Sequence, residues 1–85
     1  MWQENNNRLC RKFVFRDFPT AFSFMTHVAL LAERLDHHPA WKNVWNTVEF
    51  WLCTHSAGDV VTGKDRHMAA EIDKLAAPYP GGSAT

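Results

Sequence analysis

Three histidines stand at two places in the chain where side chains could exchange protons with a ligand. His37 and His38 are adjacent within the run Glu33–Trp41, which reads E-R-L-D-H-H-P-A-W. His55 follows the end of the longest strand-like run. An imidazole titrates near neutral pH and can therefore act as an acid or as a base. These residue types predict an acid–base site, provided that the elements carrying the histidines converge.

The adjacent histidines are expected at the end of a helix predicted over residues 20–35. Pro39 cannot continue a helix, and it pushes His38 toward extended geometry. The helix must therefore end near Asp36. His37 and His38 then lie at its C-terminal end, where the helix dipole favours a positively charged imidazolium.

The predicted helix is apolar on more than one face. The stripe expected to face the core comprises Ala21, Phe22, Met25, Val28, Ala29, Ala32 and Leu35. Phe24, His27 and Leu31 form a second row beside it. Because two apolar faces need two covering surfaces, we expect Phe24 and Leu31 to contact a neighbouring subunit. The alternative is that a loop of the same chain covers them.

Two runs alternate between apolar and polar residues as β-strands do. Residues 9–16 place Phe13 and Phe15 on one side, which is expected to be buried. Residues 43–55 give the stronger strand pattern, and Asn46-Thr47 could form a bulge or short turn that splits this run in two. The better core side of the second run carries Val48, Phe50 and Leu52.

The other side of residues 43–55 carries His55 together with Trp45 and Trp51. Large aromatic side chains on a solvent face are unusual unless something covers them. We therefore expect a ligand or another subunit on this side of the sheet.

A second helix is predicted to begin after Thr62 and to continue to about Ala76. Thr62 and Asp65 resemble a capping box, with Asp in the usual place of Glu. Residues 1–76 are interpreted as a single domain, and residues 77–85 as a flexible C-terminal tail. The element order β-β-α-β-β-α predicts an α+β fold, a two-layer sandwich in which an antiparallel sheet of about four strands carries two helices on one face.

Composition disfavours several classes of partner. Nine basic and nine acidic residues balance, so we expect neither direct nucleic acid binding nor attraction to an acidic membrane. No apolar run approaches the roughly 20 residues that span a bilayer. Cys10 and Cys53 fit no disulfide framework, which favours a reducing compartment. A zinc site is disfavoured because adjacent histidines point in different directions and no spaced ligand pair accompanies them.

Several motifs occur in a fixed order along the chain. They are F-x-F-x-D-F at Phe13–Phe18, A-F-x-F-M at Ala21–Met25, A-E-x-L-D-H-H-P-x-W at Ala32–Trp41, N-V-x-N-x-V at Asn43–Val48, Thr54-His55, and Asp65. Taken together, the set resembles the pterin-4a-carbinolamine dehydratase family over nearly the whole chain. Members of this family are also known as dimerisation cofactors of a homeodomain transcription factor.

The resemblance implies an activity and an assembly. Family members dehydrate 4a-hydroxytetrahydropterin to quinonoid dihydropterin, which recycles tetrahydrobiopterin, and they use neither a metal nor an organic cofactor. They form dimers and tetramers through the long helix, here residues 20–35. We expect a cytoplasmic enzyme, with the nucleus as a second location. This chain departs from the family pattern at Trp51 and Cys53 and in the loop after His55, so its pocket shape can differ.

The resemblance also implies roles for individual residues. The catalytic candidates are His37, His38 and His55; the substrate-binding candidates are Glu33, Asp36, Pro39, Trp41 and Thr54; Asp65 is the supporting candidate. Eliminating water needs one proton delivered to the leaving hydroxyl and one removed from the adjacent ring nitrogen. We assign His38 and His55 to this pair, and His37 to substrate orientation or a share in proton transfer.

The surrounding residues have both functional and structural interpretations. Glu33 lies four residues before His37, so it could fix that imidazole or bind the pterin's amino-pyrimidinone edge, or merely form a surface pair. Asp36 could orient a histidine or cap the helix. Trp41 could be a flat wall for the pterin or a core tryptophan. Asp65 could orient a histidine, but helix stabilisation is favoured.

A non-catalytic function is the alternative. Some relatives stabilise a transcription-factor dimer through the helical surface that they also use for assembly. Phe24 and Leu31 would carry that interaction here. The sequence contains no feature that identifies such a partner.

Overall fold

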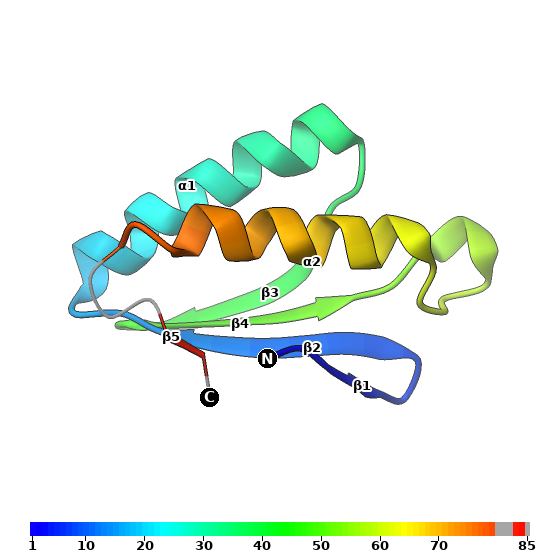
Figure 1. Cartoon of the computed structure of the whole chain (residues 1–85), viewed down its shortest axis with the longest axis horizontal. Coiled ribbons are helices and arrows are strands. Elements are labelled where there is room, and N and C mark those ends of the chain that lie inside the picture. The colour runs from blue at the N-terminus through cyan, green and yellow to red at the C-terminus, as the bar shows by residue number, and fades with distance from the viewer. Residues whose placement is uncertain (80–82, 85) are drawn as a thin grey trace.

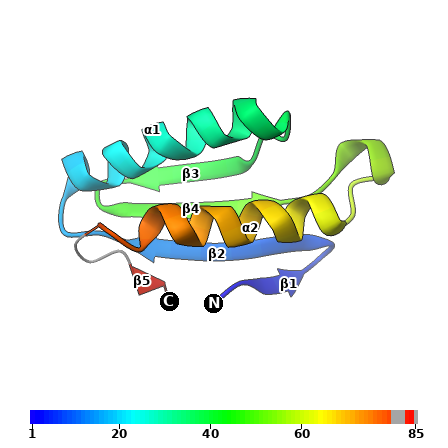
Figure 2. The ribbon, with the colours of Figure 1, turned by 45° about the horizontal axis from the view of Figure 1, so that its top comes forward.

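The computed structural model describes residues 1–79 and 83–84 and consists of a sheet covered on one face by two helices (Figure 1). The elements, in order, are β1 (Gln3–Asn5), β2 (Arg8–Val14), α1 (Phe18–Leu35), β3 (Ala40–Val44), β4 (Thr47–Leu52), the short 3₁₀ helix η1 (His55–Ala57), α2 (Gly63–Ala76) and β5 (Ser83–Ala84). Both helices lie on the same side of the sheet, which leaves its other face open (Figure 2). The predicted two-layer α+β sandwich is confirmed.

The antiparallel sheet has the strand order β1-β2-β4-β3, and the two-residue strand β5 also pairs with β2. The predicted four strands are therefore present, with one short addition. In the central pair, Leu9 lies opposite Leu52 and Phe13 opposite Val48. This register places the buried side chains of both strands on the helix-covered face. No helix among the described residues is both long and apolar enough to cross a bilayer.

The two hairpins depend on residues with positive φ. Asn6 and Asn7 both adopt positive φ between the paired residues Asn5 and Arg8, which is the pattern of a type I′ turn. The β3–β4 turn is Trp45-Asn46, because Thr47 already pairs with Val44. The split of residues 43–55 is thus confirmed, but the turn lies one residue earlier than predicted.

The face of α1 that enters the core differs from the prediction. Phe24 and Leu31 are 0% and 1% exposed and pack inside the chain's own core. Phe22, which the periodicity places on the core stripe, is 53% exposed instead. The prediction that Phe24 and Leu31 contact a second subunit is therefore wrong. Both rows of the helix are apolar, and only the position of the sheet decides which row is buried.

Packed structure continues beyond the predicted domain boundary at Ala76. The Tyr79 ring lies 6.1 Å from the rings of both Phe15 and Phe24, and its hydroxyl is 3.0 Å from Ser23 Oγ. Tyr79 therefore packs against α1 and the residue directly after β2 in the described structure. Residues 80–82 and 85, which belong to the same predicted tail, lie outside the described residues.

The ends of both helices follow their local sequence. α1 ends at Leu35, and Asp36 adopts a left-handed conformation with its N–H directed at the last carbonyls of the helix. The predicted capping box of α2 is present: Thr62 caps the helix, and the Asp65 carboxylate accepts a hydrogen bond from the Thr62 N–H at 2.9 Å.

Asp65 is fully buried and joins three parts of the fold. Besides capping α2, its carboxylate accepts a hydrogen bond from Thr54 Oγ at the end of β4, at 2.8 Å, and lies 2.6 Å from His37 Nε2. Burial alone would raise the pKa of this carboxyl, but the hydrogen bonds from Thr62, His37 and Thr54 outweigh it and leave the pKa below its ordinary value.

We predict that Asp65 makes the protein sensitive to acid. Because its pKa is lower in the folded chain than in the unfolded chain, it stabilises the fold above the unfolded pKa of about 4, and this contribution is lost as pH falls through the folded pKa. Asp65→Asn should lower the free energy of unfolding at pH 7 by about 2 kcal/mol and flatten its decline below pH 4. Urea titrations at several pH values measure both effects.

Glu49→Gln, in the partly exposed row of β4, controls for the loss of one carboxylate elsewhere in the fold. Parallel pH profiles for the wild type and Asp65→Asn would contradict the assignment.

Candidate active site

The three candidate histidines converge on one pocket of about 330 Å³. The pocket lies where the segment after α1, the segment after β4 and the first turn of α2 meet. It is lined by Asp36, His37, His38, Cys53, Thr54, His55, Ser56 and Lys64. Its volume is at the small end of the range for ligand pockets, roughly 300–1,000 Å³.

His37 is the inward-facing histidine of the site. The left-handed Asp36 reverses the chain, so the His37 N–H still bonds to the Ala32 carbonyl, at 3.1 Å, while its side chain turns toward α2. The imidazole is 11% exposed, and Nε2 lies 2.6 Å from Asp65 Oδ1. Because a carboxylate can only accept, Nε2 carries the proton of this contact, and Nδ1 is the nitrogen that remains free to accept one.

His38 lies at the rim of the pocket and is 60% exposed. Its Nε2 is 2.6 Å from Glu33 Oε1. The expectation that Glu33 shares a helix face with His37 is therefore corrected: Glu33 contacts His38 instead. The i, i+4 rule holds only within a helix, and here the helix ends between the two residues.

His55 is the most exposed of the three, with 91% of its side chain accessible. Its Nδ1 contacts the Asp59 carboxylate in the same loop. β4 ends at Leu52, and His55 starts the short helix η1, so it does not continue the sheet face. The expected grouping of His55 with Trp45 and Trp51 is wrong: within the described residues, neither tryptophan lines the pocket.

Trp45 and Trp51 both lie away from the pocket. Trp45 occupies the β3–β4 turn, about 20 Å along the strand from the pocket end of β4. Trp51 lies on the open sheet face, opposite Cys10 on one side and Ala40 on the other.

The remaining predicted binding residues are divided between the pocket and its surroundings. Asp36 and Thr54 line it, although the Thr54 hydroxyl is already bonded to Asp65. Trp41 packs on Phe50, with ring centroids 5.7 Å apart, and lines a separate apolar groove of about 200 Å³ beside α1. This placement matches the core alternative given for Trp41.

Glu33 and Pro39 are connected to the pocket only through His38 in the described structure. Glu33 reaches the site through His38. Pro39 follows His38 directly and restricts the backbone that presents it. Neither residue lines the pocket within the part of the chain that the structure describes.

Lys64 and Asp59 are site residues that the sequence interpretation missed. Lys64 lines the pocket from the first turn of α2 and adds a positive charge to a lining that also contains the carboxylate of Asp36. Its place directly before the candidate residue Asp65 could have indicated it. Asp59 gave no comparable signal, because its contact with His55 depends on the path of the loop between them.

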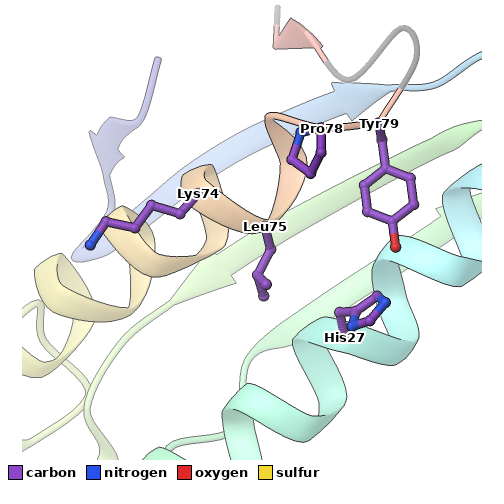
Figure 3. Close-up of a pocket in the computed structure, with 5 residues that line it drawn as sticks. All are labelled: His27, Lys74, Leu75, Pro78 and Tyr79. Carbon is purple, nitrogen blue, oxygen red and sulfur yellow. The ribbon is translucent and has the colours of Figure 1, made fainter.

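A second pocket, of about 350 Å³, lies between the helices at the C-terminal end of α2 (Figure 3). Leu75, Pro78 and Tyr79 face His27 across it, while the amino group of Lys74 points away from them. A single imidazole without a carboxylate in this lining offers less for proton transfer than the first pocket. Among the described residues, no group of three or more His, Cys, Asp or Glu side chains is arranged to hold a metal ion.

Related proteins share both the sequence and the fold. A protein from Bradyrhizobium sp. (strain ORS 278) is 51% identical over 82 residues, which cover 94% of this chain and 81% of that protein. One from Rhodopseudomonas palustris (strain HaA2) is 50% identical over 80 residues, covering 92% and 78%. Both carry the name pterin-4-alpha-carbinolamine dehydratase as a provisional assignment.

Solved structures agree with these sequence relatives. The crystal structure of a transcriptional coactivator/pterin dehydratase from Brucella melitensis superposes with a TM-score of 0.83 at 45% identity, covering 87% of this chain and 80% of that one. A pterin dehydratase-like RuBisCO assembly factor of the alpha-carboxysome has a TM-score of 0.72 at 24% identity, covering 88% and 86%, and shares the fold.

The family profile described as pterin 4 alpha carbinolamine dehydratase matches residues 1–75, which include every histidine of the pocket and its carboxylate partner. With relatives near 50% identity over most of its length, the chain belongs to the pterin-4a-carbinolamine dehydratase family of hydro-lyases.

Proposed function

We propose that this chain dehydrates a 4a-hydroxytetrahydropterin to the quinonoid dihydropterin by histidine acid–base catalysis. The observation that supports this most is the convergence of His37, His38 and His55 on one pocket, in a chain of this enzyme family. The physiological role that follows is recycling of tetrahydrobiopterin after hydroxylation reactions. A cytoplasmic location is part of the same proposal.

The reaction needs two proton transfers and no change of oxidation state. The carbon–oxygen bond at C4a breaks, and the hydroxyl leaves as water after accepting a proton. The adjacent ring nitrogen loses a proton, and its electron pair forms the new carbon–nitrogen double bond. Protons and electrons then balance without an external oxidant or reductant. A protonated imidazole and a neutral imidazole on the two sides of the ring can supply both transfers.

Exposure divides the three histidines between these tasks. His38 and His55 lie at the rim, at 60% and 91% exposure, and come from different segments of the chain. They are therefore the proposed acid–base pair. His37 is held by buried Asp65 and is nearly covered, which suits a group that orients the substrate. Positioned acid–base groups are typically worth about 10²–10⁴ in rate.

The polar edge of the pterin can be bound by two further groups in the pocket lining. Lys64 carries an ammonium group that can donate to the ring carbonyl, and Asp36 carries a carboxylate that can accept from the exocyclic amino group. Glu33, the sequence-based candidate for this role, is already paired with His38. Asp36 and Lys64 are thus the proposed binding pair.

An interaction function receives no comparable support. Phe24 and Leu31, the residues expected to carry it, are buried in the core and unavailable to a partner. Among the proteins compared above, the coactivator description belongs to the Brucella melitensis protein.

Removing either rim histidine should sharply reduce turnover. His38→Ala and His55→Ala should each lower kcat by about 100-fold, because each deletes one of the two proton transfers. Stopped-flow absorbance with freshly generated 4a-hydroxytetrahydropterin measures the rate. His67→Ala, an exposed position of α2, is the matched control and should retain wild-type turnover. Wild-type rates in both rim variants would refute the acid–base assignment.

We also propose that the chain assembles with a second copy of itself through the exposed side of α1. Phe18 and Phe22 are 43% and 53% exposed, and Phe22, Met25 and Ala29 border the groove that contains Trp41. This groove lies beside β3, the last strand of the described sheet, so an apolar surface adjoins a free strand edge. A two-fold contact between identical copies can cover both features at once.

A charge on this side of α1 should disrupt the assembly without unfolding the chain. Phe22→Asp should shift the protein to a smaller species in sedimentation velocity, because it places a carboxylate in the proposed apolar contact. Circular dichroism should remain unchanged, since the side chain is outside the core. Ala70→Asp, at an exposed position of α2, is the matched control. Equal sedimentation of Phe22→Asp and wild type would exclude this surface as the interface.

A further inference from the structure

We infer that Asp59 is the positioning residue of His55: its carboxylate fixes the orientation of the imidazole and determines which ring nitrogen carries the proton. The inference rests on the role proposed for His55 in the dehydration. Its starting observation is the contact between the Asp59 carboxylate and His55 Nδ1.

The loop between the two residues brings the carboxylate back to the ring. Gly58 and Asp59 both have positive φ, at 91° and 60°, and together they reverse the chain. The Asp59 N–H then bonds to the Thr54 carbonyl at 3.1 Å, and the Gly58 N–H bonds to the His55 carbonyl at 3.0 Å. The two ends of the loop are closed by the Thr54 N–H, which bonds to the Val60 carbonyl at 2.9 Å.

The neighbouring strand β2 also holds Asp59. Arg8 donates from Nη1 to the Asp59 carbonyl at 3.2 Å. The backbone of Asp59 is therefore bonded on both its N–H and its C=O. A carboxylate on such a backbone starts close to its final position, so less freedom is lost when it binds the imidazole.

The contact has a direct chemical consequence. The carboxylate can only accept, so His55 Nδ1 carries the hydrogen of this contact, and in the neutral ring Nε2 keeps its lone pair. His55 is 91% exposed and few other contacts restrain its ring. Without Asp59, the ring would turn freely and exchange between its two neutral tautomers. With Asp59, Nε2 is the nitrogen available for proton exchange with a ligand.

The simpler alternative is an exposed ion pair without a role, since such pairs contribute little to stability. The other histidines of the pocket argue against it, because His37 and His38 are each bound by a carboxylate of their own. Asp59 gives His55, the third histidine of the pocket, a carboxylate partner as well.

The test compares the wild type with Asp59→Asn. Asn has the same shape and also tolerates positive φ, so the loop is kept while the charge is removed. We expect kcat to fall roughly fivefold, the size of one exposed charge interaction, with KM within a factor of two. Long-range ¹H–¹⁵N spectra of the His55 ring should show the fraction protonated at Nδ1 falling in the variant.

Two further variants separate positioning from a general loss. Asp59→Glu keeps a carboxylate and should restore part of both the rate and the tautomer preference. Glu71→Gln, which removes a partly exposed carboxylate paired with Lys74 on α2, should leave both unchanged.

The outcomes distinguish this inference from the proposed function. An unchanged His55 tautomer in Asp59→Asn would overturn the positioning role, whether or not kcat falls. An inactive wild type would refute the dehydration, while the ring spectra would still report whether Asp59 orients His55. A changed tautomer with unchanged kcat in an active enzyme would also overturn the inference, since positioning would then have no effect on catalysis.

Discussion

The buried carboxylate of Asp65 is the interaction on which the site depends. It accepts hydrogen bonds from the Thr62 N–H and the Thr54 hydroxyl and also contacts His37, which fixes the start of α2 relative to the end of β4 and the segment after α1. A carboxylate at 0% exposure is costly unless it is fully paired, so these three segments must meet for the fold to be stable. The pocket lies between the same three segments. Its shape is therefore set by a requirement of folding.

The two-layer architecture explains why the reacting groups lie on loops at one end of the molecule. The sheet and the helices fill the interior between them with apolar side chains. The segments that leave the ordered elements can expose imidazoles while their backbones stay anchored. His37 is held by the core side of this junction, whereas His38 and His55 extend from its rim. One histidine is thus rigid and two are reachable, which suits binding on one side and proton exchange on the other.

Much of this arrangement could be predicted because it follows local rules. Local sequence predicts the end of α1 near Asp36, the capping box of Thr62 and Asp65, and the buried side of β4. The errors arise where a local rule stops applying. Helical spacing predicts that Glu33 lies beside His37. The left-handed Asp36 ends the helix before His37, so this spacing does not apply. Phe24 and Phe22 are both large and apolar, and only the position of the sheet decides which is buried. The contact of Asp59 with His55 depends on the path of the loop between them, in which Gly58 and Asp59 both have positive φ. The glycine predicts a turn here but does not specify that path.

The proposed contact surface of α1 and the pocket lie at opposite ends of this helix, which bears on how assembly could affect the chemistry. Phe18 and Phe22 lie in its first two turns, and the pocket begins beyond its last residue, so roughly 20 Å of helix lies between them. Each histidine of the pocket receives its carboxylate from the same chain. A second copy is thus not needed to supply any of these contacts. The proposed contact can still affect the chemistry by stabilising α1, because the segment after this helix presents Asp36, His37 and His38 to the pocket.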